Sequence, residues 1–350
     1  MSLQANDLGP CWENLSDLQT GADAGATAVR SVVESALRQR NARQTVRLAP
    51  KYGSGSVDVD VHYSWTGCAG AATVIVLGGI SAGREVCSHS TGAGWWDELV
   101  GVGRSIDLQR YRVLSIDWLC TTDLHSASAV SSEDQADVLA ALLDVLGIAQ
   151  VHAVIGASYG AMVGLAFAAR HRTRLARLIA ISGAHRAHPL ATALRSIQRQ
   201  IIRNGVAQGA VEPALALARQ LAMTTYRGAT EFADRFDQPP QLRDGRHCFA
   251  VEDYLVAAGQ KFVARFDAQR YLSLSESIDL HRIVPGDISV PTTLIAVDSD
   301  RLVPSQDLRD LAAGLAGPTQ LHELDSCYGH DAFLKEPVRI GALISSALTC

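Results

Sequence analysis

Short apolar runs alternate along this chain with segments of helical periodicity, and this alternation restricts its fold more than any other feature. The runs have the length and composition of fully buried strands, and they occupy residues 73–77, 111–116, 151–155, 175–182 and 292–297. Helical patterns lie between them, most clearly over residues 132–146, which Gly147 closes, and over residues 161–169. Strands that alternate with helices predict an α/β fold with a mostly parallel sheet covered on both faces.

Two parts of the chain depart from this alternation and divide it into three regions. From residue 57, valines alternate with polar residues, which predicts a half-buried strand at the start of the core. Residues 186–286 are rich in Ala, Arg, Gln and Leu at helical spacing and are punctuated by prolines, which indicates a helical insertion over the sheet. We therefore expect a core of residues 57–185 and 287–350, a lid of residues 186–286, and an N-terminal extension of residues 1–56. The role of this extension is unclear, although residues 26–39 have a helical pattern.

Composition and charge narrow the range of partners. Of the 350 residues, 47% are hydrophobic and 19% are charged, as in globular domains. The net charge is −5 without a basic face, so we expect no nucleic-acid partner. No signal peptide is evident, and no segment approaches the ~18 continuous apolar residues of a membrane span, so we expect no membrane partner. Seven scattered cysteines without a C-x-x-C pair indicate free thiols, a cytoplasmic location and no metal site.

The strongest local signal is the five-residue sequence GASYG over residues 156–160. It lies between the strand-like run 151–155 and the helical pattern 161–169. In a G-x-S-x-G turn, the serine occupies a strained strand-to-helix corner that lifts its Oγ clear of the sheet, and the glycines let the backbone pass close by. The N-terminus of the following helix directs its partial positive charge at the reacting carbon. Ser158 is therefore the predicted nucleophile.

A serine nucleophile needs a base, and the base needs an acid to orient it. After this type of turn, the acid precedes the histidine in the chain. The run 292–297 leads into Asp298 and Asp300, and we favour Asp300 because Asp298 is placed to cap the turn. We expect His330 to be the base, because His322 lies inside a strand pattern and the remaining histidines precede Asp300. Ser158, Asp300 and His330 form the predicted catalytic triad.

The negative charge that develops on a substrate carbonyl requires an oxyanion hole with two N–H donors. One should be the N–H of Tyr159, directly after the nucleophile, and the other should come from the loop after the run 73–77. This loop, residues 78–83, has the sequence GGISAG, and we expect the N–H of Ile80 to be the second donor. The chain has neither a G-x-G-x-x-G pattern nor a P-loop lysine, so the loop does not indicate a dinucleotide site.

Several further segments of the core and the lid carry distinctive short sequences. They are residues 94–101 (GWWDELVG), 106–107 with 110–111, 225–227 with 231–232, 251–255 (VEDYL), 259–262 (GQKF), 265–268 with Tyr271, 299–304 (SDRLVP) and 329–334 (GHDAFL). With these segments the chain resembles, over roughly residues 57–345, the homoserine O-acyltransferases of the α/β-hydrolase superfamily, the MetX-like group. The resemblance implies the α/β-hydrolase fold, with a mostly parallel central sheet and a helical lid insertion.

The same resemblance implies a reaction of methionine biosynthesis. An acyl-CoA would donate its acyl group to Ser158, and the acyl-serine would pass it to the hydroxyl of L-homoserine in a ping-pong mechanism. The acyl-CoA is then a co-substrate, and no cofactor is bound permanently. Arg227 matches the arginine that holds the acceptor carboxylate, Asp331 the acid near its ammonium, and Ser81 the small hydroxyl residue of the oxyanion loop. The family also suggests a homodimer formed through the lid.

Two departures from the family pattern leave the substrates open. Tyr159 stands where the family usually has methionine, and the loop after the fourth strand is shortened to residues 120–132. The acyl donor is therefore acetyl-CoA or succinyl-CoA. The acceptor is homoserine or, as an alternative, serine, and a serine hydrolase would use water instead. A hydrolase has no need of Arg227 together with Asp331.

Arg84 follows the oxyanion loop and has two alternative roles. If the loop covers the acyl pocket, this guanidinium could hold the carboxylate of a succinyl group, for which an acetyl group has no counterpart. Alternatively, Arg84 pairs with the neighbouring Glu85 or points to solvent.

Overall fold

A computed structural model describes residues 40–89, 92–125 and 127–349 of the chain. Within this part, eight strands form one sheet in the order β1-β2-β6-β3-β7-β8-β11-β12. Strand β2 runs antiparallel to both of its neighbours, and the other neighbouring strands are parallel. The strands are β1 (Arg40–Leu48), β2 (Val57–Thr66), β3 (Ala72–Leu77), β6 (Tyr111–Ile116), β7 (Ala153–Ala157), β8 (Leu178–Ile181), β11 (Thr292–Val297) and β12 (Thr319–Leu324).

The mostly parallel sheet confirms the predicted α/β fold class, and every predicted strand is present. Strand β1 was not predicted, and it lies in the N-terminal extension. It pairs along its whole length with β2, so residues 40–48 contribute an edge strand to the core sheet. Only two of its nine residues, Val46 and Leu48, are buried. Two alternating apolar positions are too few to indicate a strand from the sequence. The predicted helix over residues 26–39 lies outside the described residues.

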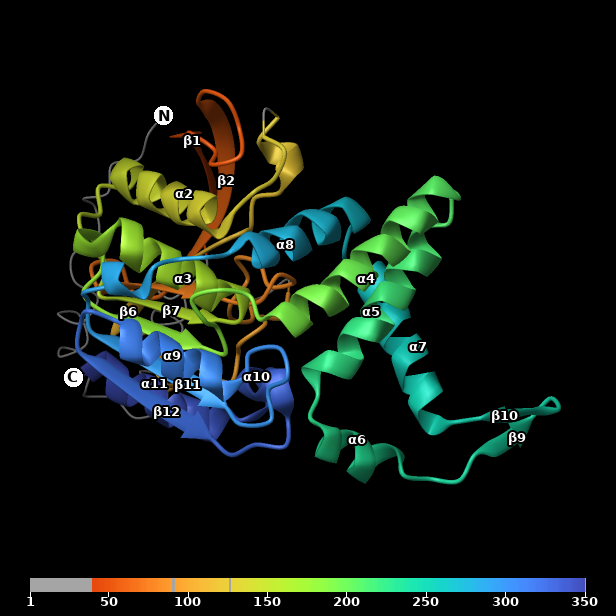
Figure 1. Cartoon of the computed structure of the whole chain (residues 1–350). Coiled ribbons are helices and arrows are strands. Elements are labelled where there is room, and N and C mark those ends of the chain that lie inside the picture. Colours follow the sequence, from red (N-terminus) through yellow and green to blue (C-terminus); the bar gives the residue numbers. More distant parts are fainter. Residues whose placement is uncertain (1–39, 90–91, 126, 350) are drawn as a thin grey trace, which may run out of the picture.

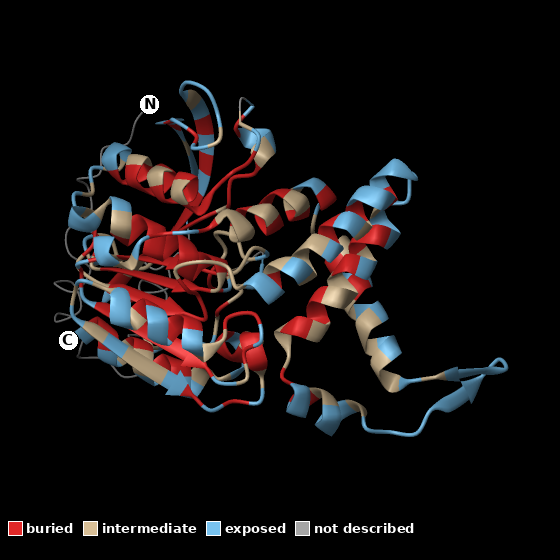
Figure 2. Ribbon diagram, viewed as in Figure 1, coloured by how far each residue is buried: buried red, intermediate tan, exposed pale blue. Residues whose placement is uncertain are grey.

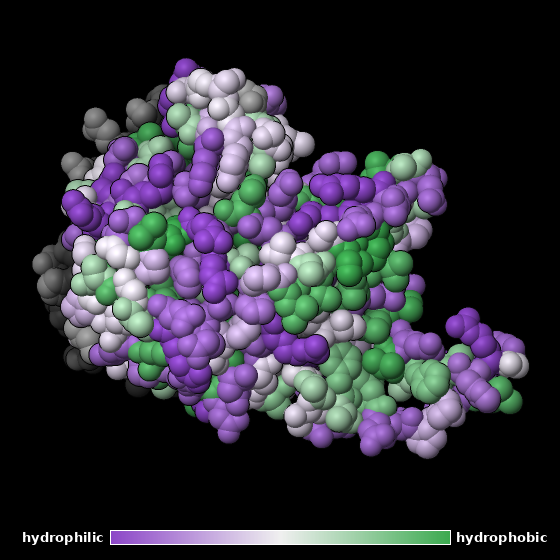
Figure 3. All heavy atoms as spheres, viewed as in Figure 1, coloured by the Kyte–Doolittle hydropathy of each residue, from purple (hydrophilic) through white to green (hydrophobic). Residues whose placement is uncertain are grey.

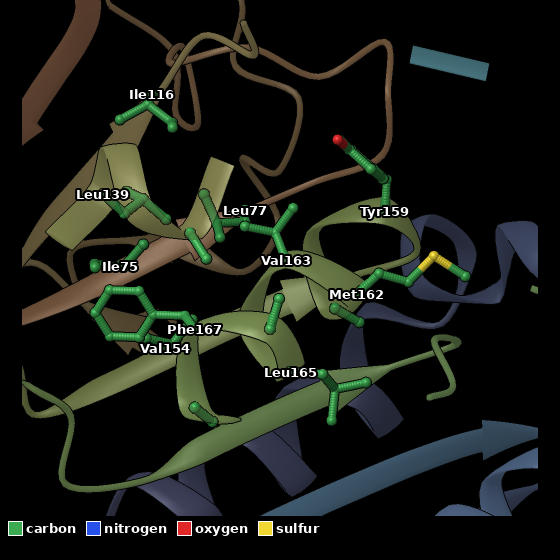
Figure 4. Close-up of a cluster of buried hydrophobic side chains, with 14 of the residues drawn as sticks. Ile75, Leu77, Ile116, Leu139, Val154, Tyr159, Met162, Val163, Leu165 and Phe167 are labelled. Atoms are coloured by element: carbon green, nitrogen blue, oxygen red, sulfur yellow. The ribbon is translucent and has the colours of Figure 1, made fainter. Parts of the chain in front are cut away.

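Apolar side chains cover both faces of the sheet, which is why its strands read as continuous apolar runs. In β3, Ile75 and Leu77 belong to the cluster on one face, and Val74 and Val76 belong to the cluster on the other. Figure 4 shows part of the first cluster, where the helix that follows Ser158 packs Phe167 near Ile75 and Leu77. Buried residues concentrate in the sheet and its adjacent helices, and the outer end of the lid is mostly exposed (Figure 2).

Helices pack on both faces of the sheet. Of the helices outside the segment between β8 and β11, the first cluster includes buried residues of α2 (Ser132–Val145), α3 (Tyr159–Arg170) and α9 (Ser305–Gly314), and the second includes those of α10 (Ala332–Lys335) and α11 (Pro337–Thr349). Helix α2 begins at a capping box, in which Ser131 Oγ accepts from the Asp134 N–H at 3.0 Å and Asp134 accepts from the Ser131 N–H at 2.7 Å. Two short strands, β4 (Val100–Gly101) and β5 (Ile106–Asp107), pair apart from the main sheet.

Between β8 and β11 the chain forms the predicted helical lid. Its elements are α4 (Pro189–Ala207), α5 (Val211–Tyr226), α6 (Ala229–Phe236), the hairpin of β9 (Gln241–Arg243) and β10 (Arg246–Cys248), α7 (Ala250–Val263) and α8 (Ala268–Leu280). Figure 1 shows α4, α5 and α7 projecting away from the sheet, with the hairpin at the far end and α8 returning beside the core. In the described part of the chain, no helix is both long enough and apolar enough to span a bilayer.

Candidate active site

Ser158 occupies the sharp corner between β7 and α3. Its φ of 56° and ψ of −120° lie outside the regions that non-glycine residues normally adopt. The flanking backbone segments are so close that only glycine fits between them. A Cβ built on Gly156 would lie 2.2 Å from the Gly160 carbonyl oxygen, and one on Gly160 would lie 2.3 Å from the Leu77 carbonyl oxygen. The corner therefore has the geometry predicted from the sequence, with Ser158 beyond the C-terminal end of a buried strand.

Ser158, His330 and Asp300 form a continuous hydrogen-bonded row although they are far apart in the chain. Ser158 Oγ lies 2.7 Å from His330 Nε2, and His330 Nδ1 lies 2.7 Å from Asp300 Oδ2. An ionised carboxylate can only accept, so Nδ1 carries the donated proton and Nε2 is left to accept from the serine hydroxyl. In this tautomer the imidazole is placed to remove the serine proton.

The two candidate acids have different surroundings. Asp300 is 3% exposed, and its second carboxylate oxygen accepts from the N–H groups of Leu302 at 2.8 Å and Val303 at 3.0 Å. These bonds fix the plane of the carboxylate toward His330. Asp298 is exposed and accepts from two backbone N–H groups, those of Ser299 at 2.7 Å and Ser326 at 3.1 Å. Asp298 thus holds the turn together, and Asp300 is the acid in contact with the histidine.

The environment of His330 shifts its proton affinity. Burial lowers the pKa of His330, but the charge and the hydrogen bond of Asp300 outweigh it, and the pKa lies above its ordinary value of 6.5. A more basic imidazole accepts the serine proton more readily. The ring is also packed against Tyr226, which stacks on it with ring centres 6.0 Å apart.

The residues predicted to supply the oxyanion donors lie close to Ser158. Tyr159 is the first residue of α3, so its N–H has no acceptor within the helix. Gly79, in the loop of residues 78–83, lies beside Ser158, because a Cβ built on this glycine would be 4.0 Å from the serine Cβ. Trp118 Nε1 donates to the Gly79 carbonyl at 3.0 Å and so holds the loop in place. Ile80 and Ser81, the two predicted residues of this loop, line the same cavity as Ser158.

A cavity of about 660 Å³ separates the core from the lid in front of Ser158. Its floor consists of the turn around Ser158 and the loop of residues 78–83. Its walls come from α4, α5, the α7–α8 connection and the segment around His330. Five basic side chains face it. They are Arg195, Arg219, Arg227, Arg265 and Lys335.

Arg227 and Asp331, the two residues expected to bind an amino acid, lie together in this cavity. Arg227 Nε is 3.1 Å from Asp331 Oδ2, and Arg227 also donates to Glu231 at 2.8 Å. Asp331 directly follows His330, so the ion pair lies next to the imidazole that contacts Ser158. Burial raises the pKa of Asp331, and Arg227 opposes this increase. Asp331 is the N-terminal flanking residue of α10, but its side chain does not cap that helix.

Arg84 is the predicted site residue that the structure does not bring to the cavity. Its guanidinium forms an ion pair with Asp117, its backbone N–H donates to the same carboxylate at 2.9 Å, and Glu85 lies 3.5 Å away. Arg84 is not among the residues that line the cavity. The structure thus places Arg84 in ion pairs with Asp117 and Glu85, as in the alternative role expected from the sequence, and gives no support to a role in holding a succinyl carboxylate.

Tyr159, the departure from the family pattern, is one of the residues that line the cavity, and its side chain is buried. The ring is 1% exposed and packs edge-on against Trp118, and its hydroxyl lies 2.6 Å from Ser277 Oγ on α8. Tyr159 therefore joins the start of α3 to α8 of the lid.

Two residues of the site were missed from the sequence. Tyr226, the last residue of α5, stacks on His330, and Arg219 lies over the Tyr226 ring with its guanidinium carbon 5.1 Å from the ring centre. A separation of seven residues places both side chains on one face of a helix, which was the available signal. Which face points to the cavity depends on how the lid packs, and the sequence pattern alone does not give this.

Residues 72–337 match the family model described as the alpha/beta hydrolase fold. The chain is 49% identical to a homoserine O-succinyltransferase of Xanthomonas campestris pv. campestris, over 85% of this chain and 81% of that protein. It is 34% identical to a homoserine O-acetyltransferase of Symbiobacterium thermophilum, over 70% of this chain and 77% of the relative.

A solved structure supports the same fold. The crystal structure of homoserine O-acetyltransferase from Bacillus anthracis superimposes with a TM-score of 0.80 at 17% sequence identity, over 89% of this chain and 98% of the other. At this identity the likeness concerns the fold alone. The predicted central sheet with its helical lid is thereby confirmed as an α/β-hydrolase architecture.

Proposed function

Because the chain belongs to the alpha/beta hydrolase fold family and, within it, to the homoserine O-acyltransferases, we propose that it transfers an acyl group from acyl-CoA to the hydroxyl of L-homoserine. The observation that carries this proposal is the Arg227–Asp331 pair in the cavity of Ser158. An amino acid presents a carboxylate and an ammonium on one carbon, and a guanidinium beside a carboxylate matches both.

In the first half-reaction, Ser158 becomes acylated. His330 Nε2 accepts the hydroxyl proton while Oγ attacks the thioester carbonyl, and the N–H groups of Tyr159 and Ile80 stabilise the oxyanion. The carbon–sulfur bond then breaks, His330 returns the proton to the sulfur, and CoA leaves as the thiol. Asp300 stabilises the imidazolium that exists between these two proton transfers.

In the second half-reaction, the amino acid takes the place of CoA. Its carboxylate would bind the Nε edge of Arg227, and its ammonium would bind Asp331, so the acceptor replaces an internal ion pair with two external ones. Glu231 keeps its contact with Arg227 and orients the guanidinium. The homoserine hydroxyl gives its proton to His330 and attacks the acyl carbon. The bond to Ser158 Oγ breaks, and His330 returns the proton to the serine.

Two alternatives remain, and they differ in the acceptor. Serine has one methylene fewer than homoserine, so its hydroxyl would stop short of the acyl carbon when its charged groups occupy the same clamp. A hydrolase would let water discharge the acyl-serine, and the Arg227–Asp331 pair would then be unused. Homoserine as the acceptor of both relatives described above supports our choice.

Two further expectations from the sequence stay predictions. They are a homodimer formed through the lid and a cytoplasmic location. Exposed apolar side chains on α4 and α5 support the first (Figure 3).

The test of the proposed function is the release of CoA from acetyl-CoA and from succinyl-CoA, measured with homoserine, with serine and with buffer alone. We expect turnover with homoserine and, without an acceptor, only a burst of about one CoA per active site. In Arg227→Lys, which retains the charge but loses the fork geometry, the burst should persist while turnover with homoserine falls. Equal steady turnover with and without an amino acid would identify a hydrolase instead.

A further inference from the structure

The loop of residues 78–83, which is expected to supply one oxyanion donor, contains a tight turn. The N–H of Ala82 donates to the Gly79 carbonyl at 3.0 Å, so Ile80 and Ser81 are the two central residues of this turn. A turn closed by such a bond uses neither of its central N–H groups. The N–H of Ile80 is therefore left for an external acceptor, and its direction depends on how the two ends of the loop are held.

Asp117 and Trp118, the two residues that follow β6, hold opposite ends of this loop. Trp118 donates to Gly79 at its start. At its end, Asp117 Oδ1 accepts from the backbone N–H of Arg84 at 2.9 Å, and Oδ2 accepts from the Arg84 guanidinium. A Cβ built on Gly83 would lie 2.7 Å from Asp117 Oδ1, so glycine at this position lets the carboxylate approach the backbone. Asp117 thus fixes the place where the chain leaves the turn.

Strand β2 supports this contact from behind. The backbone N–H of Asp117 donates to the His62 carbonyl at 2.9 Å, and Ser64 Oγ donates to the Arg84 carbonyl at 2.5 Å. The backbone of Arg84 is therefore fixed at both its N–H and its carbonyl. Through Asp117 and Arg84, the buried sheet is connected to the loop that carries Ile80.

The ion pair of Arg84 with Asp117 is only partly withdrawn from water. The two side chains are 26% and 34% exposed, and ion pairs as accessible as this contribute little to stability. Small errors of position have larger effects on catalysis. Loss of one oxyanion donor lowers turnover by about 10²–10³-fold, and a displacement of about 1 Å can cost about 10²-fold. The contact is therefore more important for the direction of the Ile80 N–H than for the fold.

We propose that Asp117 is a positioning residue of the oxyanion hole, which directs the N–H of Ile80 at the acyl carbonyl through its bond to the backbone of Arg84. The inference rests on the acyl transfer proposed above, with Ile80 as one of the donors. The guanidinium of Arg84 orients the Asp117 carboxylate. An oxyanion forms in both half-reactions, so a displaced loop slows both by the same factor, whereas a residue that binds one substrate affects one half-reaction.

The experiment measures each half-reaction in a single turnover. Acylation is followed by the burst of CoA release at varied donor concentration, and transfer by the loss of the preformed acyl-enzyme after addition of homoserine. In Asp117→Ala, we expect both rate constants to fall at least about tenfold. The donor concentration at half-saturation should stay within about twofold of wild type, because the oxyanion hole acts on the transition state. The burst should remain at about one CoA per protein, which a partly unfolded variant would not show.

Two further variants separate the contacts of Asp117. In Asp117→Asn, the amide oxygen can still accept from the backbone N–H of Arg84, so both rate constants should lie within about threefold of wild type. Arg84→Met keeps that N–H but no longer orients the carboxylate, and both rate constants should fall at least about threefold. This variant also tests the proposal if Asp117→Ala does not fold.

The matched control is Asp107→Ala. Asp107 likewise accepts from two backbone N–H groups, those of Gly103 at 3.2 Å and Gln109 at 3.0 Å. It is not among the residues that line the cavity. Its replacement should therefore leave the rate constants of both half-reactions unchanged.

A second measurement uses a stable mimic of the tetrahedral intermediate, trifluoroacetonyl-CoA, in which a trifluoromethyl ketone replaces the thioester. Ser158 Oγ bonds to the ketone carbon, its proton passes to His330, and the electron pair of the carbonyl moves to the oxygen, which then occupies the oxyanion hole. From wild type to Asp117→Asn to Asp117→Ala, the Kd of this mimic should rise by about the same factor as the acylation constant falls.

Four results would overturn this inference while leaving the proposed function intact. They are unchanged rate constants in Asp117→Ala or in Arg84→Met, a defect confined to one half-reaction, an Asp117→Asn variant as slow as Asp117→Ala, and a mimic that binds Asp117→Ala as tightly as wild type. Failure of the wild type to release CoA from either donor would instead overturn the proposed function, and the inference with it.

Discussion

Ser158 shows how a single residue combines strain and function. Its left-handed backbone is maintained because β7 and α3 are both buried and because glycine occupies positions 156 and 160. The strain is local, and the surrounding core is rigid enough to keep it. The result is a hydroxyl that points out of the sheet at the one place where His330 can reach it.

At the same scale, the acid of the triad can be identified by paired substitutions. In Asp300→Asn, the remaining oxygen is still required by the Leu302 and Val303 N–H groups, so the amide NH₂ faces His330 and favours the wrong tautomer. We expect turnover to fall by about 10³-fold or more. Asp298→Asn is the control, because an amide oxygen can still accept from Ser299 and Ser326. A crippled Asp298→Asn beside a nearly normal Asp300→Asn would reverse our assignment.

The raised pKa of His330 predicts the direction of a pH effect. Only the neutral imidazole can take the serine proton, so acylation should be lost as the pH falls through this pKa, which lies above 6.5. In Asp300→Asn, loss of the negative charge should move the midpoint to lower pH. Burst rates measured between pH 5 and pH 9 provide the test, and a wild-type midpoint below 6.5 would contradict the predicted direction.

The residues of the site were predictable to different degrees. Ser158 and His330 stand in recognisable local patterns, and chain order restricted the acid to two candidates. The partner of Arg84 was not predictable, because Asp117 follows a strand that enters the sheet beside β2 and meets the oxyanion loop only after folding. The guanidinium of Arg219 escaped notice for a similar reason, since its neighbours come from two different lid helices.

At the level of secondary-structure elements, the contact of α3 with α8 joins the turn around Ser158 to the lid. Tyr159 begins α3, and its hydroxyl lies 2.6 Å from that of Ser277 on α8 in a fully buried setting. Tyr159→Phe or Ser277→Ala alone would leave one buried hydroxyl without this partner, and each should lower the free energy of unfolding by about 1–3 kcal/mol.

The double variant distinguishes a specific bond from general packing. With both hydroxyls removed, no buried polar group is stranded, so the combined loss should be smaller than the sum of the two single losses. Urea unfolding of the four proteins measures this coupling. Strictly additive losses would show that the two hydroxyls do not interact.

Elements were predicted from sequence where burial was complete and missed where it was not. Strands such as β3 and β11 are buried on both faces, so their apolar runs are unmistakable. Strand β1 is an edge strand stabilised by polar pairs, such as Arg47 with Asp58 at 3.0 Å and Thr45 with Asp60 at 2.6 Å. Strand β1 belongs to the sheet because its backbone pairs with β2. Most of its side chains are exposed, so its sequence has no apolar pattern that would predict a strand.

For the whole molecule, the lid leaves apolar surface uncovered. Leu190, Ile197 and Val206 on α4 and Leu217 on α5 are each at least 41% exposed, and Figure 3 shows apolar side chains gathered over this part of the lid. We predict that a second copy of the chain covers this surface, so light scattering should report a dimer. Leu217→Glu should shift the protein toward the monomer.

The control for the dimer is Val338→Glu. Val338 is 82% exposed on α11, which packs on the core sheet. Its replacement should leave the dimer intact. A monomeric wild type at micromolar concentration, or dissociation caused by Val338→Glu and not by Leu217→Glu, would rule out the lid as the interface.

Detection of the acyl-enzyme intermediate tests most directly whether the protein transfers an acyl group through Ser158. The protein is mixed with succinyl-CoA without an acceptor, quenched, and examined by intact mass and peptide mapping. We predict one succinyl group on Ser158, lost rapidly when homoserine is added before the quench and slowly in buffer alone, and no adduct in Ser158→Ala. An acyl group on another residue, or one that water discharges as fast as homoserine does, would contradict the account.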